Sequence, residues 1–287
     1  MQEVNFESPT RIDISRNILD ISKTFDCGQC FRWNAQSLQQ WVGVVNGKVY
    51  YIAQTPKDST EEFILTSASM REWETELKPY LGIERDYTTT IPKDDTFATE
   101  ASLAGAGIRI LNQDPWETLI SFIISQRNNI PKIKSTVDKL CKSFGDKLEI
   151  GYKDKIQRDS IYSFPTPDKI AKLSLEELKP IGLGYRDEYV LLAARQVAEG
   201  KLDLERLKGG SISTDEAIYT LMQLKGVGIK VANCVALFGL HRLDTFPIDV
   251  WIKRIIDTYY GGNLDPRVYG DKSGLIQQYM FYYIKNS

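Results

Sequence analysis

A glycine-rich turn constrains this chain more than any other feature of its sequence. It reads Leu224-Lys-Gly-Val-Gly-Ile-Lys-Val-Ala232 and runs into a helical stretch. Gly226 and Gly228 let the backbone reverse tightly where a side chain would not fit, so the pattern predicts a hairpin between two helices. Amides from Gly226 to Val231 would then lie at the positive end of the second helix, which suits a phosphate oxygen. The turn therefore predicts a binding site for a nucleic-acid phosphate, but it does not indicate whether the protein catalyses a reaction.

Two charged side chains after this turn point to chemistry. Lys230 falls in the first turn of the second helix, where the positive end of the helix dipole disfavours its ammonium form. A lysine without its extra proton is a nucleophile. Further along, Pro247 precedes Asp249 in a pattern typical of a helix start, which allows the carboxylate to face the lysine across one cleft. The alternative is a non-catalytic docking hairpin, with Asp249 serving only as a helix cap.

Composition neither requires nor excludes a nucleic-acid partner. The chain has 287 residues, 42% of them hydrophobic and 26% charged, which is ordinary for a globular protein with room for two domains. A net charge of -2 argues mildly against nucleic acid, but a binding face needs only a local excess of positive charge. Candidates for this excess are Arg127, Lys132, Lys134, Lys139 and Lys142, the last two of which a solvated helix face explains equally well.

Cysteine and histidine usage limits metal chemistry. The pair Cys27-x-x-Cys30 has no second pair, since only Cys141 and Cys234 remain, and His241 is the one imidazole. We therefore expect no four-ligand zinc or iron–sulfur site and no cofactor or catalytic metal. A single histidine also fits a Ser-His-Asp mechanism poorly. No signal peptide or membrane-spanning apolar run is visible, which predicts a cytoplasmic protein, associated with the nucleoid if bacterial or nuclear if eukaryotic; we expect a monomer.

The hydrophobic periodicity changes along the chain. Residues 1–96 are sheet-rich, because Asn46-Gly47 predicts a type I′ turn between strands over 41–45 and 48–52, and residues 63–66 predict another strand. A helix over 69–81 and a linker over 87–95 follow. From about Phe97 the pattern is helical, with helix starts at Asp114-Pro115 and near Pro131, capping boxes at Ser174/Glu177 and Ser213/Glu216, and helices over 187–200 and 274–284.

The motif Gly-Val-Gly-x-Lys230 followed by Pro-x-Asp249 resembles the helix-hairpin-helix, Gly/Pro/Asp superfamily of DNA glycosylases. A lysine at this position resembles the bifunctional members, and the lack of any cysteine after Cys234 separates the chain from the branch with a C-terminal four-cysteine cluster. The resemblance implies an α+β fold with an N-terminal antiparallel β-sheet domain followed by two all-α subdomains. The implied units are a TBP-like domain over 1–96, a helical subdomain over 97–127 plus 245–287, and a helical subdomain over 128–244 that carries the hairpin.

Other stretches resemble the 8-oxoguanine DNA glycosylases within that superfamily. Asp26–Trp33 is similar to a Gly-Gln-x-Phe-Arg-Trp strand whose glycine carbonyl, here Gly28, would accept the N7 hydrogen that only the oxidised base carries. Gln277 and Phe281 are similar to a family helix that binds the edge and face of the flipped base, and Cys234 would line the other side. Considered without the family, Gly28 is equally well explained as a strand bulge, while Phe281 is explained as a residue of the hydrophobic core and Cys234 as a small buried apolar residue.

The positions expected to contact DNA around the lesion match the family only in part. Arg127-Asn128-Asn129 stands where the family reads Asn-Asn-Asn, whose first residue fills the hole left by the base. Lys132 stands where eukaryotic members have an arginine that reads the orphaned cytosine, and lysine is not equivalent at a bidentate contact. The resemblance therefore predicts weaker discrimination for cytosine opposite the lesion than the eukaryotic enzymes show.

Three more positions complete the implied DNA-binding set. Tyr185 and Arg186 keep the family's wedge tyrosine and its second cytosine-reading arginine, whereas Trp251 replaces a histidine that touches phosphate. The resemblance thus implies a bifunctional DNA glycosylase and AP (apurinic or apyrimidinic site) lyase that excises 8-oxoguanine from double-stranded DNA by base flipping, a Schiff base on Lys230 and β-elimination. Two alternatives stay open: a monofunctional glycosylase for other damaged bases, and a non-catalytic DNA-binding protein.

Overall fold

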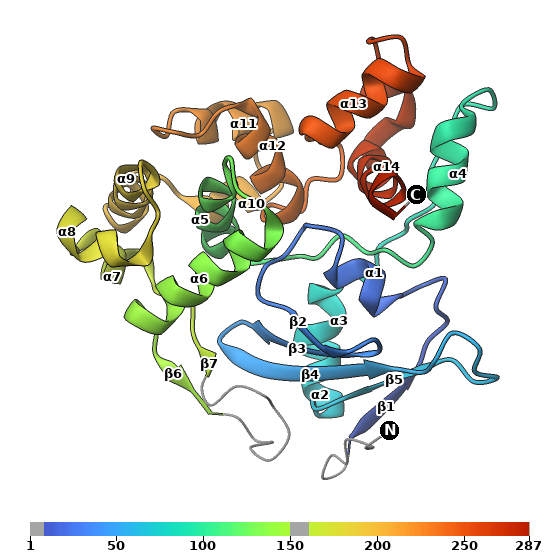
Figure 1. Ribbon diagram of the computed structural model, residues 1–287, viewed down its shortest axis with the longest axis horizontal. Helices are drawn as coiled ribbons and strands as arrows, with labels where there is room; N and C mark the ends of the chain where they lie inside the picture. Colours follow the sequence, from blue (N-terminus) through green and yellow to red (C-terminus); the bar gives the residue numbers. More distant parts are fainter. Residues whose placement is uncertain (1–8, 150–160, 287) are drawn as a thin grey trace.

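The computed structural model describes residues 9–149 and 161–286 of the chain. Its antiparallel sheet lies at one end of the molecule, below the helices in the view of Figure 1. The strand order is β1-β5-β4-β3-β2. The strands are β1 (Thr10–Asp13), β2 (Asn34–Ser37), β3 (Gln40–Val45), β4 (Lys48–Gln54) and β5 (Phe63–Thr66).

The local signals at this end of the chain are confirmed. Asn46 and Gly47 take the positive φ angles of 49° and 75° that the turn between β3 and β4 requires. The helix expected over 69–81 is present, with Ser69 and Glu72 forming a capping box. It is less regular than expected, because a π-helical turn at Trp73–Leu77 separates α2 (Met70–Glu72) from α3 (Lys78–Tyr80).

Helices make up most of the remaining chain, so the expected α+β fold class is confirmed. No helix among the described residues has the length and apolar character needed to cross a membrane. The longer helices are α4 (Thr96–Ala104), α5 (Pro115–Ser125), α6 (Ile130–Phe144), α9 (Arg186–Ala198), α11 (Thr214–Met222), α12 (Ile229–Phe238), α13 (Val250–Tyr259) and α14 (Ser273–Asn286). Shorter elements are α1 (Ile21–Phe25), α7 (Pro167–Ala171), α8 (Leu175–Leu178), α10 (Leu204–Lys208) and the two-stranded pair β6 (Lys147–Leu148) and β7 (Ile161–Tyr162).

Helix α5 forms the centre of one group of helices, and it packs against α6, α9, α10 and α12. A second group brings α4 and α13 against α14, on the other side of α12 in Figure 1. The predicted caps explain where these helices begin, because Asp114 caps α5 with Pro115 in its first turn, and Ser174 and Ser213 form the expected capping boxes of α8 and α11.

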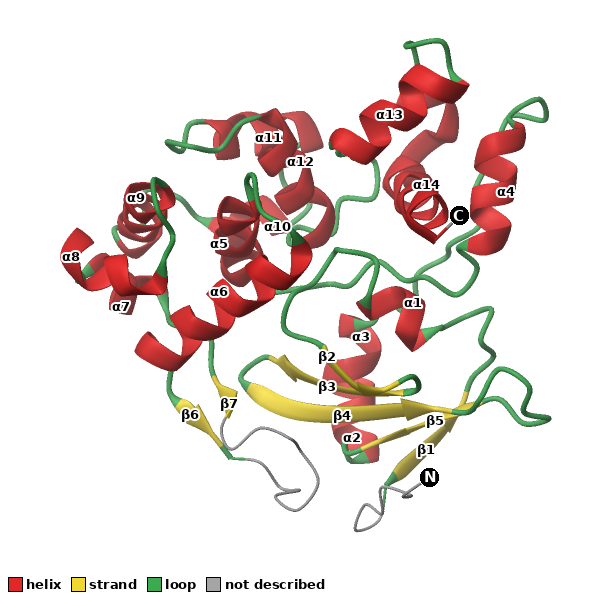
Figure 2. Cartoon of the chain, viewed as in Figure 1, coloured by secondary structure: helices red, strands yellow, loops and turns green. Residues whose placement is uncertain are grey.

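The segment from Asp26 to Trp33 differs from expectation. Its resemblance predicted a strand, but this segment is irregular, is drawn as loop in Figure 2, and the strand β2 begins only at Asn34. Its side chains explain why: Phe31 packs in the core of the helices, whereas Trp33 packs in the core of the sheet, stacked 4.0 Å from Phe25. The segment thus crosses from one core to the other and cannot run along a sheet edge.

Candidate active site

The glycine-rich turn forms the predicted hairpin between α11 and α12. Gly226 has a φ of 84°, and a Cβ atom there would overlap the ring of Tyr189. At Gly228 a Cβ atom would meet no chain atom within 4 Å, so the steric reason predicted for both glycines holds for Gly226 alone. Gly228 is the N-cap of α12 and no side chain caps this helix, which leaves its first amides for an external acceptor.

Lys230 and Asp249 occupy the starts of two helices, as the sequence predicted. Lys230 is the second residue of α12, and its Nζ lies 5.5 Å from the centroid of the Phe122 ring. Asp249 is the N-cap of α13, where its Oδ1 accepts hydrogen bonds from the amides of Trp251 (3.0 Å) and Ile252 (2.9 Å). These two bonds fix the orientation of a carboxylate that is only partly buried.

Cys234 connects these two charged groups. Burial raises the pKa of the Cys234 thiol to about 11, so the side chain is a neutral thiol at pH 7. The smaller influences on this pKa come from Lys230, which lowers it by charge and by a side-chain hydrogen bond, and from Asp249, which raises it. Both charged groups therefore lie near enough to this buried sulfur atom to influence its pKa.

Two of the residues expected to bind the base, Gly28 and Phe281, come together although they lie near opposite ends of the chain. A Cβ atom at Gly28 would lie 3.2 Å from Cε1 of Phe281 and 3.6 Å from Cδ1 of Ile130. Gly28 has a φ of 78° and is not in a strand, so the strand-bulge alternative is wrong. The neighbouring Gln278 of α14 donates a hydrogen bond from Nε2 to the carbonyl of Cys27, which fixes this loop against α14.

Gln277, on the same helix as Phe281, carries a buried side-chain oxygen with unused hydrogen-bonding capacity. Its side chain is only 4% exposed, and its Oε1 is buried without a hydrogen-bond partner among the described residues. An unpaired buried oxygen costs free energy, so such atoms in native proteins usually await water or a ligand. Within residues 9–149 and 161–286, the carbonyl of Gly28 likewise accepts no backbone hydrogen bond.

The loop between α5 and α6 carries the residue expected to fill the gap in the duplex. Arg127 is exposed and takes a left-handed φ of 53°, a conformation that asparagine adopts more readily than arginine. The side chains of Asn128 and Asn129 both form hydrogen bonds within the protein. Asn128 donates from Nδ2 to the carbonyl of Ile124 (2.8 Å), and Oδ1 of Asn129 caps α6 by accepting the amide of Lys132 (2.9 Å). The side chain of Lys132 itself is exposed.

The wedge tyrosine and its neighbour lie in the turn before α9. Tyr185 is half exposed, whereas Arg186 is only 8% exposed and its guanidinium carbon lies 4.4 Å from the centroid of the Tyr185 ring. Arg186 also donates to the carbonyl of Leu183 (2.9 Å) and to the carbonyl of Gln126. These bonds use two of its five N–H groups, so the expected contact with a base must come from the donors that remain.

Two further predicted DNA contacts are changed by the structure. Val231 is 3% exposed and packs in the helical core, so only its amide can meet a phosphate and a side-chain contact is excluded. Trp251 is 37% exposed beside Asp249, but its indole has one donor where a charged histidine would carry two. Two residues of this region were not predicted from the sequence, because no local motif marks them. Phe122 of α5 lies next to Lys230, and Gln126 at the end of α5 donates to the carbonyl of Gly226.

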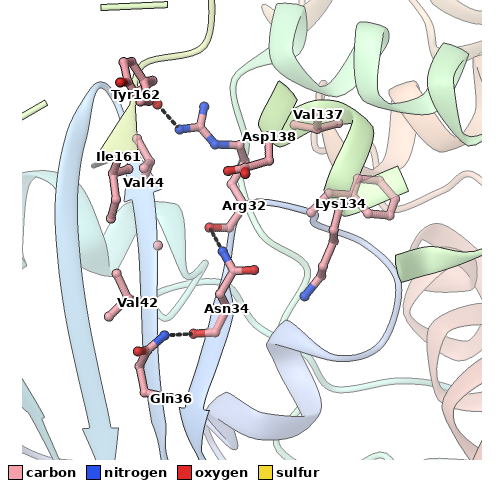
Figure 3. Close-up of a pocket in the computed structure, with 12 residues that line it drawn as sticks. Arg32, Asn34, Gln36, Val42, Val44, Lys134, Val137, Asp138, Ile161 and Tyr162 are labelled. Atoms are coloured by element: carbon pink, nitrogen blue, oxygen red, sulfur yellow. Dashed lines mark hydrogen bonds between the residues drawn. The ribbon is translucent and has the colours of Figure 1, made fainter. Parts of the chain in front are cut away.

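A separate cavity of about 30 Å³ lies between β2, β3 and α6, and none of the predicted catalytic or base-binding residues lines it. Figure 3 shows Arg32 reaching from this cavity toward the carbonyl of Tyr162. Arg32 also lies 3.5 Å from Glu117, whose pKa burial raises to about 7. These contacts join the loop before β2 to α5 and β7, and we assign them a structural role.

Known proteins match the chain along most of its length. The family model "8-oxoguanine DNA glycosylase, N-terminal domain" matches residues 11–119, and the model "HhH-GPD superfamily base excision DNA repair protein" matches residues 120–268. An N-glycosylase/DNA lyase of Saccharomyces cerevisiae is 32% identical over 273 residues, which cover 87% of this chain and 70% of the relative. An N-glycosylase/DNA lyase of Arabidopsis thaliana is 30% identical, over 90% of this chain and 72% of the relative.

The fold has equally similar counterparts among solved structures. An 8-oxoguanine glycosylase/lyase of Clostridium acetobutylicum, in complex with double-stranded DNA containing cytosine opposite 8-oxoguanine, superposes with a TM-score of 0.80 at 30% identity. The match covers 94% of this chain and 92% of that one. The chain therefore belongs to the HhH-GPD superfamily of base excision DNA repair proteins and carries the N-terminal domain of its 8-oxoguanine DNA glycosylases.

Proposed function

We propose that this protein is a bifunctional glycosylase and AP lyase that excises 8-oxoguanine from double-stranded DNA and then cleaves the strand. The observation that carries the proposal is that Lys230 lies in the first turn of α12, whose start no side chain caps, while Asp249 caps the start of α13. A lysine and a carboxylate at two helix starts, one of which can bind phosphate, suit covalent chemistry on a sugar in DNA. The N-glycosylase/DNA lyase activity of the yeast relative supports the same conclusion.

Recognition of the base is proposed to depend on unpaired acceptors. The Gly28 carbonyl would accept the N7 hydrogen of 8-oxoguanine, and guanine, which lacks this hydrogen, would leave the carbonyl buried and unpaired. The orphaned Oε1 of Gln277 would accept a second hydrogen from the edge of the base. The ring of Phe281, which lies against Gly28, would stack on the face of the base.

The chemistry is proposed to start once the damaged nucleotide has left the duplex, which costs a few kcal/mol of stacking and pairing. The neutral amine of Lys230 attacks the anomeric carbon, and the electron pair of the glycosidic bond leaves with the base. Asp249 stabilises the positive charge that develops on the sugar. The C1′–O4′ bond of the sugar ring then opens, with O4′ taking up a proton, which leaves a Schiff base between C1′ and Lys230. β-Elimination breaks the C3′–O3′ bond and so cuts the strand on the 3′ side. This sequence of steps needs no redox cofactor.

The proposed site draws on all three units predicted from the sequence. Gly28 comes from the unit over 1–96, whereas Asp249, Gln277 and Phe281 come from the unit over 97–127 plus 245–287. Lys230 and Cys234 come from the unit over 128–244. Because each unit supplies part of the site, one chain is sufficient for the reaction, and we propose that the protein acts on DNA as a monomer.

One assay separates this function from the two alternatives. Under single-turnover conditions, a duplex with one 8-oxoguanine is expected to lose the base and to be nicked, while duplexes with guanine or 3-methyladenine at the same position stay intact. A monofunctional glycosylase would release a base and leave the strand uncut. A non-catalytic DNA-binding protein would bind the damaged duplex and change neither bond, and either result would overturn the proposal.

A further inference from the structure

Gln126, the residue at the end of α5, makes contacts that join three separate elements. Its Nε2 donates to the carbonyl of Gly226 in the hairpin (3.1 Å) and to the carbonyl of Ile123 in α5 (3.2 Å). Its own carbonyl accepts a hydrogen bond from Arg186, in the turn before α9. Both acceptors of the side chain are carbonyls, so the amide orientation follows from the hydrogen bonds.

The contacts continue from Gly226 and return to Arg186. The ring of Tyr189 occupies the space beside Gly226 that a side chain would need. Tyr189 packs edge-on against Tyr185, with ring centroids 5.8 Å apart, and the guanidinium of Arg186 lies 4.4 Å from the centroid of the Tyr185 ring. The five residues therefore form a closed ring of contacts, which we call the reading ring: Gln126, Arg186, Tyr185, Tyr189 and Gly226.

Each element in the reading ring is also next to a group proposed to act on DNA. Gln126 precedes Arg127, the residue at the tip of the gap-filling loop. Tyr185 is the proposed wedge, and Gly226 lies in the hairpin that leads to Lys230. The side chain of Gln126 supplies the one direct hydrogen bond in the ring between the loop and the hairpin.

We propose that Gln126 is a positioning residue that couples extrusion of the base to the placement of the hairpin. The inference rests on the proposed function, since it assumes that the loop and the wedge open the duplex while Lys230 performs the chemistry. Without the hydrogen bond to Gly226, the loop and hairpin can shift relative to each other, so the base would leave the duplex without reaching the amine correctly. Placement errors of about 1 Å can cost up to roughly 100-fold in rate.

The direct test removes the donor and keeps the length of the side chain. Gln126→Met has no N–H to offer the two carbonyls. We expect single-turnover excision of 8-oxoguanine from duplex DNA to fall roughly tenfold. Strand cleavage at a preformed abasic site, which needs no base extrusion, is expected to stay within about twofold of wild type, because Lys230 and Asp249 are unchanged.

A matched control is available in the hairpin itself. Gln223 is exposed and its Nε2 donates to the carbonyl of Tyr219 (3.1 Å), which lies on the same helix and joins no second element. Gln223→Met is therefore expected to leave both activities unchanged. An equal loss of both activities in Gln126→Met would mean a merely structural role, and no loss in either would mean no role; both results overturn the inference.

A second variant gives a pH signature that a structural role would not produce. In Gln126→Glu, an ionised carboxylate would face two carbonyl oxygens and repel them, whereas its protonated form can donate one hydrogen bond. The excision rate of this variant, divided by that of wild type at each pH, is expected to rise as the pH falls from 8 toward about 5. A constant ratio would contradict the inference. If wild-type protein fails to excise 8-oxoguanine at all, the proposed function fails instead.

Discussion

Gly28 lies directly against the ring of Phe281, so that a Cβ atom on the glycine would come within 3.2 Å of the phenylalanine Cε1. The first residue follows α1 near the N-terminus and the second lies in α14, the last helix. Their contact, supported by the bond from Gln278 to the Cys27 carbonyl, places a backbone acceptor beside an aromatic ring. This pairing is what a pocket for a flipped base requires.

The first prediction concerns Gly28→Ala. The added methyl group would press on Phe281, and the φ of 78° disfavours any side chain, so we expect a loss of about 1–2 kcal/mol in the free energy of unfolding. Excision of 8-oxoguanine should fall roughly 10- to 100-fold because the acceptor and the ring move apart. Thermal unfolding and single-turnover kinetics measure the two effects.

Gly47→Ala is the matched control for that substitution. Gly47 has a φ of 75°, close to that of Gly28, but a Cβ atom there meets nothing within 4 Å. The control should therefore lose similar stability and keep full excision. If Gly28→Ala behaves in the same way, the contact with Phe281 has no part in binding the base.

The second prediction concerns the base opposite the lesion. By the resemblance, Arg127 stands where the family usually has asparagine and Lys132 where the eukaryotic enzymes have arginine, and Arg186 donates to two backbone carbonyls. We therefore expect excision rates that differ by less than about tenfold among the four opposing bases. Rates that fall steeply for every base except cytosine would contradict this expectation.

The substitution Arg127→Asn is expected to change the stability of the protein without changing its preference for the base opposite the lesion. Asparagine adopts the left-handed φ of 53° more easily than arginine, so the variant should unfold at a higher temperature, gaining about 0.5–1 kcal/mol. It should not by itself create a strong preference for cytosine, because Lys132 is unchanged. A lower unfolding temperature would show that the arginine makes compensating contacts.

The third prediction uses His241, the only histidine in the chain. Burial lowers its pKa from about 6.5 to about 4, and one ring nitrogen lies 3.0 Å from the carbonyl of Ile110. Between pH 6.5 and 4, the unfolded chain therefore binds a proton at His241, whereas the folded chain does not. The resulting stability is fully present above pH 6.5 and is lost as the pH falls toward 4, by about 3 kcal/mol.

Two measurements check this sign. The single imidazole signal in an NMR titration of the folded protein should move only near pH 4. Asparagine tolerates the left-handed φ of 57° at position 241, so His241→Asn is a suitable variant. Its free energy of unfolding should fall less than that of wild type between pH 6.5 and 4. An imidazole that titrates near 6.5 in the folded protein would overturn the assignment.

Local signals in the sequence predicted much of this structure. The Asn46-Gly47 turn, the caps at Asp114 and Asp249, and the helix starts after Gly228 and Asn129 all depend on residues within one turn of each other. Such features follow from short-range hydrogen bonds and allowed φ angles, which one stretch of sequence determines. The grouping of Gly28 with Phe281, in contrast, came from resemblance to a family, since no local rule joins residues so far apart.

The sequence could not reveal contacts that depend on packing between helices. Burial of Val231 and Arg186 follows from how α12 and α9 dock on α5, and the hydrogen bond from Gln126 to Gly226 depends on the same docking. The irregular path of Asp26–Trp33 has the same origin, because Phe31 and Trp33 belong to different cores. Motif spacing carries no information about such distances.

The fourth prediction tests the central claim, which is that the amine of Lys230 forms a bond to the deoxyribose. Borohydride added during the reaction should reduce the Schiff base and leave wild-type protein covalently attached to the damaged duplex. Lys225→Gln, which changes an exposed lysine in the same hairpin paired with Glu188, should be attached as well. Lys230→Gln should bind the duplex and form no adduct, whereas an adduct with Lys230→Gln at the wild-type level would contradict the account.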